Sequence, residues 1–204
     1  MRALFVFLLA VSSVMAAPRL IYTKSFPGSV PAFIEIAVER SGDGFYKDDP
    51  KDEDPLKFQL SSADTDQIFH LADSLGHFTR PLEAKAKVAN MGMKTFRYED
   101  GAEGAGAEVK FNFSENPDAQ ALADWFERMA ETERAYIELE RAVRFDKLGV
   151  QDAILQIEIV RDQKRLTAPQ QFLPLLDRVA KNESFLHIAR DRAGELADQI
   201  RAAK

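Results

Sequence analysis

Apolar and polar residues alternate along the first half of the chain. In the segment FIEIAVE, for example, Ile34, Ile36 and Val38 alternate with Glu35 and Glu39. A period of two is typical of a strand that buries one face and exposes the other. The same pattern predicts strands over Arg19–Phe26, Ala32–Glu39, Phe45–Lys47, Leu56–Leu60, Lys94–Glu99 and Glu108–Ser114. Ser41–Gly44 has the glycines of a hairpin turn, and Asp100–Ala107 is predicted to be a flexible tip.

One amphipathic helix interrupts these strands. Its apolar face would consist of Ile68, Leu71, Ala72 and Leu75. Asp64, with Gln67 three residues later, is the predicted N-cap.

The pattern becomes helical at Asn116. An asparagine followed by a proline is a typical helix start, and this helix should run to about Asp146. Val150–Arg165 predicts a second helix, although its β-branched residues leave a strand as the alternative. A short helix should begin near Pro174. Asn182 is the predicted cap of a last helix with an apolar face of Leu186, Ala189, Ala193, Leu196 and Ile200.

These elements predict an α+β fold. The N-terminal half would be an antiparallel sheet of about five strands with one helix, and the C-terminal half a helical bundle. The corresponding division is residues 1–17, 18–115 and 116–204, the first of these being a signal peptide.

The long helix carries the most regular stripe in the chain. Its spacings of three and four are the period that keeps one helix face against a partner over several turns. The stripe comprises Leu122, Trp125, Met129, Thr132, Tyr136, Leu139 and Val143. We expect the last helix of the same chain to be the partner, with its alanines opposite Trp125 and Tyr136. The alternative is the same helix of a second subunit, which would make the protein a homo-oligomer. The charged residues beside the stripe are expected to form a solvated face.

The N-terminus predicts export. Arg2 precedes the apolar run ALFVFLLAV, and Ala16 and Ala17 are the small residues that signal peptidase requires. This run is much shorter than the roughly 20 residues of a membrane-spanning helix. We therefore expect a mature periplasmic or secreted protein without a membrane span.

Composition narrows the classes of function. There is no cysteine, which excludes disulfides and thiolate chemistry. The 33 acidic residues outnumber the 27 basic ones, whereas a nucleic-acid binder would usually be basic. No nucleophile elbow, phosphate loop or His-Glu-x-x-His motif occurs, and no cofactor is predicted.

An acidic loop is the best metal candidate that the sequence offers, because His70, His77 and His187 lack the spacing of a zinc site. Divalent hard cations prefer several oxygen ligands from one loop. The loop lacks the spacing of a calcium-binding loop, and Lys51 lies within it, so a solvated loop is the preferred interpretation. Its carboxylates belong to Asp48, Asp49, Asp52, Glu53 and Asp54.

Three segments give the chain a resemblance to known proteins: LIYTKSFPGSVP at 20–31, FDKLGV at 145–150 and QFLPLLDRVA at 171–180. They resemble a group of exported bacterial proteins of unknown function, which also have a strand-rich half followed by a helical half. The resemblance implies a bacterial envelope location and assigns no catalytic residue. We therefore expect a non-catalytic binding or scaffolding protein with an unknown protein or envelope partner. The alternative is an exported hydrolase that uses clustered carboxylates, with or without a loop-bound cation.

Overall fold

The computed structural model describes residues 17–101 and 106–203, and it confirms the α+β fold. The predicted signal peptide, apart from Ala17, and residues 102–105 of the predicted tip lie outside the described residues. The elements are β1 (Arg19–Ser25), β2 (Phe33–Glu39), β3 (Asp43–Lys47), β4 (Leu56–Gln59), α1 (Ser62–Ser74), the short 3₁₀ turn η1 (Gly76–Phe78), β5 (Met93–Glu99), β6 (Gly106–Phe111), α2 (Pro117–Phe145), α3 (Val150–Asp162), the 3₁₀ turn η2 (Pro169–Phe172), α4 (Leu173–Lys181) and α5 (His187–Ala202).

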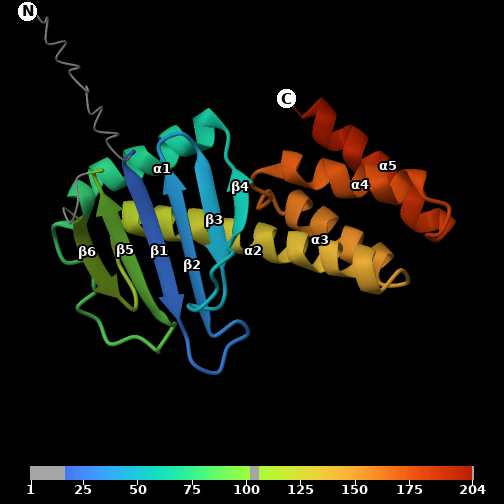
Figure 1. The fold of residues 1–204 in the computed structure, drawn as a ribbon. Coiled ribbons are helices and arrows are strands. Elements are labelled where there is room, and N and C mark those ends of the chain that lie inside the picture. The colour runs from blue at the N-terminus through green and yellow to red at the C-terminus, as the bar shows by residue number, and fades with distance from the viewer. Residues whose placement is uncertain (1–16, 102–105, 204) are drawn as a thin grey trace, which may run out of the picture.

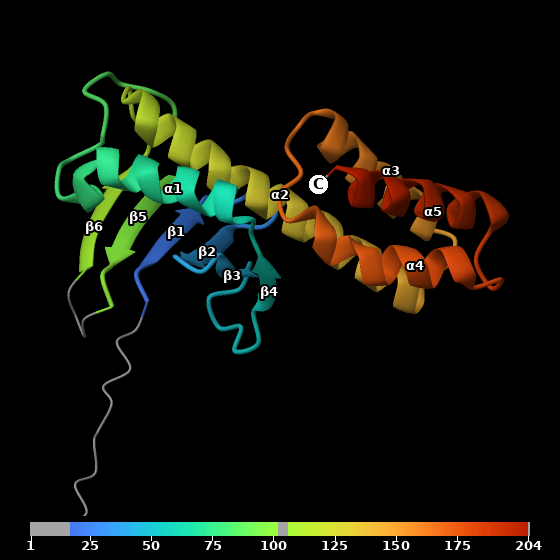
Figure 2. The same ribbon diagram turned by 90° about the horizontal axis from the view of Figure 1, so that it is seen from above.

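The sheet has six strands rather than about five, in the order β4-β3-β2-β1-β5-β6, and every neighbouring pair is antiparallel. The alternation seen in the sequence separates its two faces. In β1, Leu20 and Tyr22 are buried, whereas the residues that alternate with them, Ile21 and Thr23, are only half-buried. Helices α1 and α2 lie against the inner face, and within the described residues no helix covers the outer face (Figures 1 and 2).

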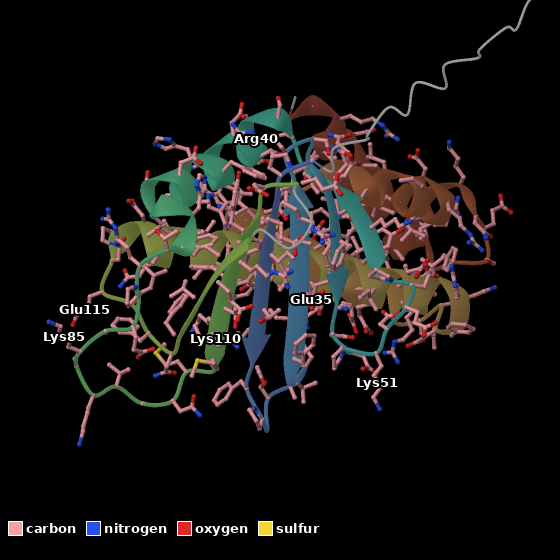
Figure 3. The ribbon with its side chains drawn as sticks, turned by 60° about the vertical axis from the view of Figure 1, so that its left-hand side comes forward. Glu35, Arg40, Lys51, Lys85, Lys110 and Glu115 are labelled. Carbon is pink, nitrogen blue, oxygen red and sulfur yellow. The ribbon has the colours of Figure 1, made fainter. Side chains whose placement is uncertain are left out.

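The outer face carries charges of both signs. Figure 3 shows Glu35 of β2 and Lys110 of β6 on this side of the molecule. Lys47 forms an ion pair with Glu35 at 3.2 Å, and Lys110 pairs with Glu108 at 3.0 Å. This face is therefore a solvated surface in which these charges already have partners.

The predicted start of α1 was wrong by one turn. The N-cap is Ser61, whose hydroxyl oxygen accepts a hydrogen bond from the backbone N–H of Asp64 at 3.1 Å. Asp64 lies inside the first turn instead, where its negative charge interacts favourably with the helix dipole.

Helix α2 begins as predicted. The side-chain oxygen of Asn116 accepts hydrogen bonds from the N–H groups of Asp118 at 2.9 Å and Ala119 at 3.3 Å, and Pro117 occupies the first turn. The first half of α2 packs beneath the sheet, and its second half extends beyond it and packs against α3 and α4 (Figure 2). One helix therefore belongs to two separate hydrophobic cores.

The C-terminal half is helical, so the strand alternative for residues 150–165 was wrong. The short helix begins at Leu173, one residue before Pro174. Asn182 was wrongly predicted to cap the last helix. It follows the end of α4 and caps a turn by accepting a hydrogen bond from Ser184 N–H, while α5 begins only at His187. Leu186 is consequently exposed instead of forming part of the buried face.

The predicted pairing of α5 with the stripe of α2 was also wrong. Helix α5 packs on α4 and α3, whereas α2 packs on the sheet, α1, α3 and α4. Trp125 lies in the core beneath the sheet, and Ala189 and Ala193 lie in the helical core. The stripe could not show this, because a 3.5-residue period indicates a buried helix face without identifying what buries it.

Candidate functional site: a groove along α2

A groove runs along the side of α2 that neither core covers. Its first stretch has a volume of about 190 Å³ and lies between the β1–β2 loop and α2. A second stretch of about 410 Å³ lies between α2 and α3, and it shares Glu131 and Arg134 with the first. A third of about 530 Å³ lies beside the β3–β4 loop and shares Asp48 and Ile137 with the second. Because neighbouring stretches share lining residues, they form one surface, which we call the α2 groove.

The length of the α2 groove follows from helix geometry. It extends from Glu127 to Arg144. At 1.5 Å per residue this separation corresponds to about 26 Å, the length of roughly eight residues of extended polypeptide.

At the first end of the groove, the charges neutralise one another. The Glu127 carboxylate accepts hydrogen bonds from the Tyr22 hydroxyl at 2.9 Å and from Lys24 Nζ at 2.8 Å. Burial, and then the Glu127 charge, raise the pKa of the Tyr22 phenol far above its usual value. Tyr22 therefore acts as a hydrogen-bond donor that holds Glu127 in place.

Several other charged side chains of the groove also have partners. Arg165 binds Glu131 through its Nε at 2.5 Å and Asp124 through Nη1 at 2.8 Å. Arg144 pairs with Glu140 at 2.8 Å.

The centre of the groove also contains polar groups that have no ion-pair or hydrogen-bond partner within residues 17–101 and 106–203. Asp48 and Arg134 form no ion pair there, and the Tyr46 hydroxyl, although buried, makes no hydrogen bond. Both charges act on Tyr46: burial and the Asp48 charge raise the pKa of its phenol, while Arg134 opposes them. Two exposed side chains of opposite charge, Asp48 and Arg134, are therefore available for a ligand in the central stretch of the groove. The unpaired Tyr46 hydroxyl is buried beside the neighbouring stretch, which Asp48 also lines.

A buried carboxyl group, Glu133, also acts on Tyr46. Glu133 is 0% exposed, and its Oε1 accepts a hydrogen bond from Gln171 Nε2 at 2.8 Å. Burial raises the pKa of Glu133 to about 8, and the Gln171 bond only partly offsets this increase. Glu133 Oε2 and Gln171 Oε1 have no partner among the described residues. A carboxyl group with such a pKa is suited to acid–base chemistry, but Glu133 does not line the α2 groove.

The predicted metal candidates all lie on the β3–β4 loop and are exposed: Asp48, Asp49, Asp52, Glu53 and Asp54. The side chains of Asp49 and Asp52 accept hydrogen bonds from the loop's own backbone, at Lys51 N–H and Asp54 N–H. In the part of the chain that the structure describes, no three His, Asp or Glu side chains are grouped to hold a metal ion. Asp48, Asp52 and Asp54 do line the α2 groove.

The predicted helix-packing residues lie inside the chain. Leu122, Trp125, Met129, Thr132, Leu139 and Val143 are buried, and Tyr136 is half-buried. The polar member, Thr132, accepts a hydrogen bond from Thr167 N–H at 3.0 Å. The charged flanks are not only a solvated face, because the Arg128 guanidinium lies over the Trp125 ring at 4.2 Å. Whether the protein forms a homo-oligomer stays a prediction.

No protein-family model, curated protein or solved structure matches this chain. None of the helices in residues 17–101 and 106–203 combines the length and hydrophobicity needed to cross a membrane. The function must therefore be inferred from the groove itself.

Our sequence interpretation missed Arg134 and Glu133 as functional candidates. A signal for Glu133 was present, because it continues the spacing of Leu122, Phe126 and Met129 on the face of α2 that packs against the sheet. A charged residue in such a series indicates a buried carboxyl group. Nothing local distinguishes Arg134 from the other arginines of the helix, since its lack of a partner depends on the loop that folds beside it.

Proposed function

We propose that this chain is a non-catalytic exported protein that binds an extended segment of a partner polypeptide in the α2 groove. The observation that carries the proposal is the centre of the groove, where Asp48 and Arg134 provide exposed, unpaired charges of opposite sign. A polypeptide has N–H and C=O groups at every residue and side chains of either charge, so it can satisfy both.

The shape and lining of the groove support the same class of ligand. It is long, and its lining contains apolar side chains such as Phe26, Ala135 and Ile137 as well as the charged ones. Long open surfaces of mixed polarity suit extended chains, whereas small-molecule sites are usually enclosed and mostly apolar.

A hydrolase is the weaker proposal. The raised pKa of Glu133 is the observation that favours it, because a protonated carboxyl group at neutral pH can act as a general acid. Such an acid must reach the substrate, however, and Glu133 is fully enclosed.

The test uses the mature chain from residue 18 and a phage-displayed library of random 12-residue peptides. Binding of the selected peptides is measured by isothermal titration. We expect Arg134→Ala and Asp48→Asn each to weaken binding by roughly ten-fold, the effect of losing one charge-assisted hydrogen bond. Both side chains are exposed, so the melting temperature should stay unchanged.

Arg178→Ala is the matched control, since Arg178 is an exposed arginine of α4 outside the groove. A library that yields no binding peptide would contradict the proposal. Peptides that bind all three variants and the parent equally well would place binding elsewhere on the molecule.

A further inference from the structure

Strand β4 is one of the two edges of the sheet. Leu60 N–H donates to Gly42 C=O at 2.9 Å, which continues the β3–β4 register in which Phe58 is opposite Gly44. Hydrogen-bonded pairs alternate along an antiparallel ladder, so Phe58 and Leu56 also bond to β3. The backbone N–H and C=O groups of Lys57 and Gln59 therefore point away from β3, toward the free edge.

This edge opens onto the α2 groove. Leu56 and Lys57 of β4 line the stretch of about 530 Å³, and Ile137, Glu140 and Arg144 of α2 line it from the opposite side. In Figure 1, β4 is the strand nearest the helical half, so this space lies between the sheet edge and the helices. A volume of this size is within the usual range of 300–1,000 Å³ for ligand sites.

The surroundings of the other edge are different. Just beyond β6, Asn112 N–H donates to Glu83 at 2.6 Å, and Ala84 N–H donates to Phe113 C=O at 2.8 Å. The chain itself covers that end of the sheet. For β4, within the described residues, no hydrogen bond from outside the sheet reaches the backbone of Lys57.

The β3–β4 loop beside β4 is negatively charged, whereas Lys47, Lys57 and Arg144 supply positive charge to the same stretch of the groove. The loop carries five carboxylates and a single lysine, Lys51, and none of these carboxylates forms an ion pair within residues 17–101 and 106–203. Tyr46, which is 1% exposed, lines the same stretch of the groove and has an unpaired hydroxyl. The free edge favours a ligand with backbone hydrogen-bonding groups, and the exposed carboxylates of the loop favour positive charge in that ligand.

We propose that an extended, lysine- or arginine-bearing segment of a partner polypeptide binds here by adding as a strand to β4. The inference rests on the proposed function, the binding of extended polypeptide in the α2 groove. Main-chain hydrogen bonds to Lys57 and Gln59 align the segment. Lys57 repels a basic residue directly opposite it, so the basic side chains of the segment lie toward Asp52 and Asp54.

The experiment uses an eight-residue peptide of alternating valine and lysine and a second peptide with glutamate in place of lysine. Two further peptides keep the valine–lysine sequence but carry N-methyl groups on either the odd or the even residues. N-methylation removes backbone donors without changing the charge, and the protein itself stays unaltered. Binding is measured by titration, together with the amide resonances of Lys57 and Gln59 by NMR.

We expect the valine–lysine peptide to bind and the glutamate peptide to bind at least ten-fold more weakly. One N-methylated peptide should lose at least ten-fold in affinity and the other much less, because only alternate residues of an added strand face β4. The amides of Lys57 and Gln59 should become protected from hydrogen exchange on binding. The double variant Asp52→Asn/Asp54→Asn should weaken binding of the lysine peptide.

The outcomes separate the two proposals. If both N-methylated peptides bind as well as the parent while Arg134→Ala abolishes binding, the groove binds peptides but strand addition is wrong. Equal binding of the glutamate and lysine peptides would overturn the preference for a basic segment. If neither the lysine peptide nor any library peptide binds, both proposals fail.

Discussion

The two cores of this protein are built from different side chains. Beneath the sheet, Tyr22, Phe96 and Phe126 are in mutual contact, with ring centroids 4.9–6.2 Å apart, and Phe78 and Phe111 contact Phe96. The helical core is rich in alanine instead: Ala135, Ala142, Ala153, Ala189, Ala193 and Ala197. Helices approach one another closely when small residues lie between them, whereas the wider gap between a sheet and its helices must be filled by large ones.

Helix α2 joins the cores by changing the face that it buries. Phe126 contributes to the first core and Ala135 to the second. Nine residues separate them, which is about two and a half turns, so they lie on opposite sides of the helix. The regular stripe from Leu122 to Val143 runs along the border of these two faces. The uncovered side of the second half of α2 then becomes a wall of the groove.

This comparison predicts that the sheet core is most sensitive to truncation. Phe96→Ala should cost about 3–5 kcal/mol, because Phe96 is 0% exposed and contacts four other aromatic rings that cannot all move into the space. Urea unfolding measures the loss. Phe145→Ala is the control, since Phe145 is 82% exposed. A loss for Phe96→Ala below about 1 kcal/mol would show that this core can collapse around a cavity.

Truncation in the helical core should cost somewhat less on average. Leu139→Ala removes a side chain that is 0% exposed and should cost about 2–5 kcal/mol, with the exposed Leu148→Ala as the control. Sedimentation of both variants accompanies the unfolding measurement. A Leu139→Ala protein as stable as the parent, but monomeric where the parent is a dimer, would make the stripe an interface between subunits.

The boundary between the cores should respond to pH through Glu133. Its pKa of about 8 lies above that of an unfolded glutamate, so the folded state holds a proton that the unfolded state has released. The contribution of this proton to the free energy of unfolding is present in full below about pH 4 and is lost as the pH rises toward 8. From pH 5.5 to 8 the loss is roughly 3 kcal/mol, at 1.36 kcal/mol per unit. Glu133→Gln should remove this slope, as measured by denaturation across that range, and an unchanged slope would contradict the raised pKa.

Enlarging an alanine should test the close packing of the helices. Ala193→Leu inserts three carbons where α5 meets its neighbours and should cost about 1–3 kcal/mol. Ala121→Leu, on the exposed side of α2, should be close to neutral. If both variants unfold at the same denaturant concentration as the parent, the helical core is looser than its alanines suggest.

The smallest effect is expected from calcium. The carboxylates of Asp49 and Asp52 already bond to the backbone of their own loop, so millimolar Ca²⁺ should change the melting temperature negligibly. A ligand at 100 times its dissociation constant would add about 2.7 kcal/mol, a shift of roughly 5–10 °C for a protein of this size. A shift of that size, reversed by a chelator, would show that the loop binds Ca²⁺.

The sequence alone was enough to predict the strands, the long helix and the buried stripe, because these depend on spacing within one segment. The alternation around Ile36 predicts a half-buried strand, and Asn116-Pro117 predicts a helix start, whatever lies opposite. The acidic loop was also visible as a charged, exposed segment.

Only the tertiary structure decided which surfaces meet. The partner of the stripe, the unpaired state of Arg134 and Asp48, and the free edge of β4 all depend on residues distant in sequence. The hydrogen bond that the buried Glu133 accepts likewise comes from Gln171, which is 38 residues away. The periodicity of apolar residues indicates how much of a helix or strand is buried, but it does not identify the segment that buries it. The groove exists because α2 leaves the sheet and turns a different face to α3 and α4, an arrangement that no local pattern specifies.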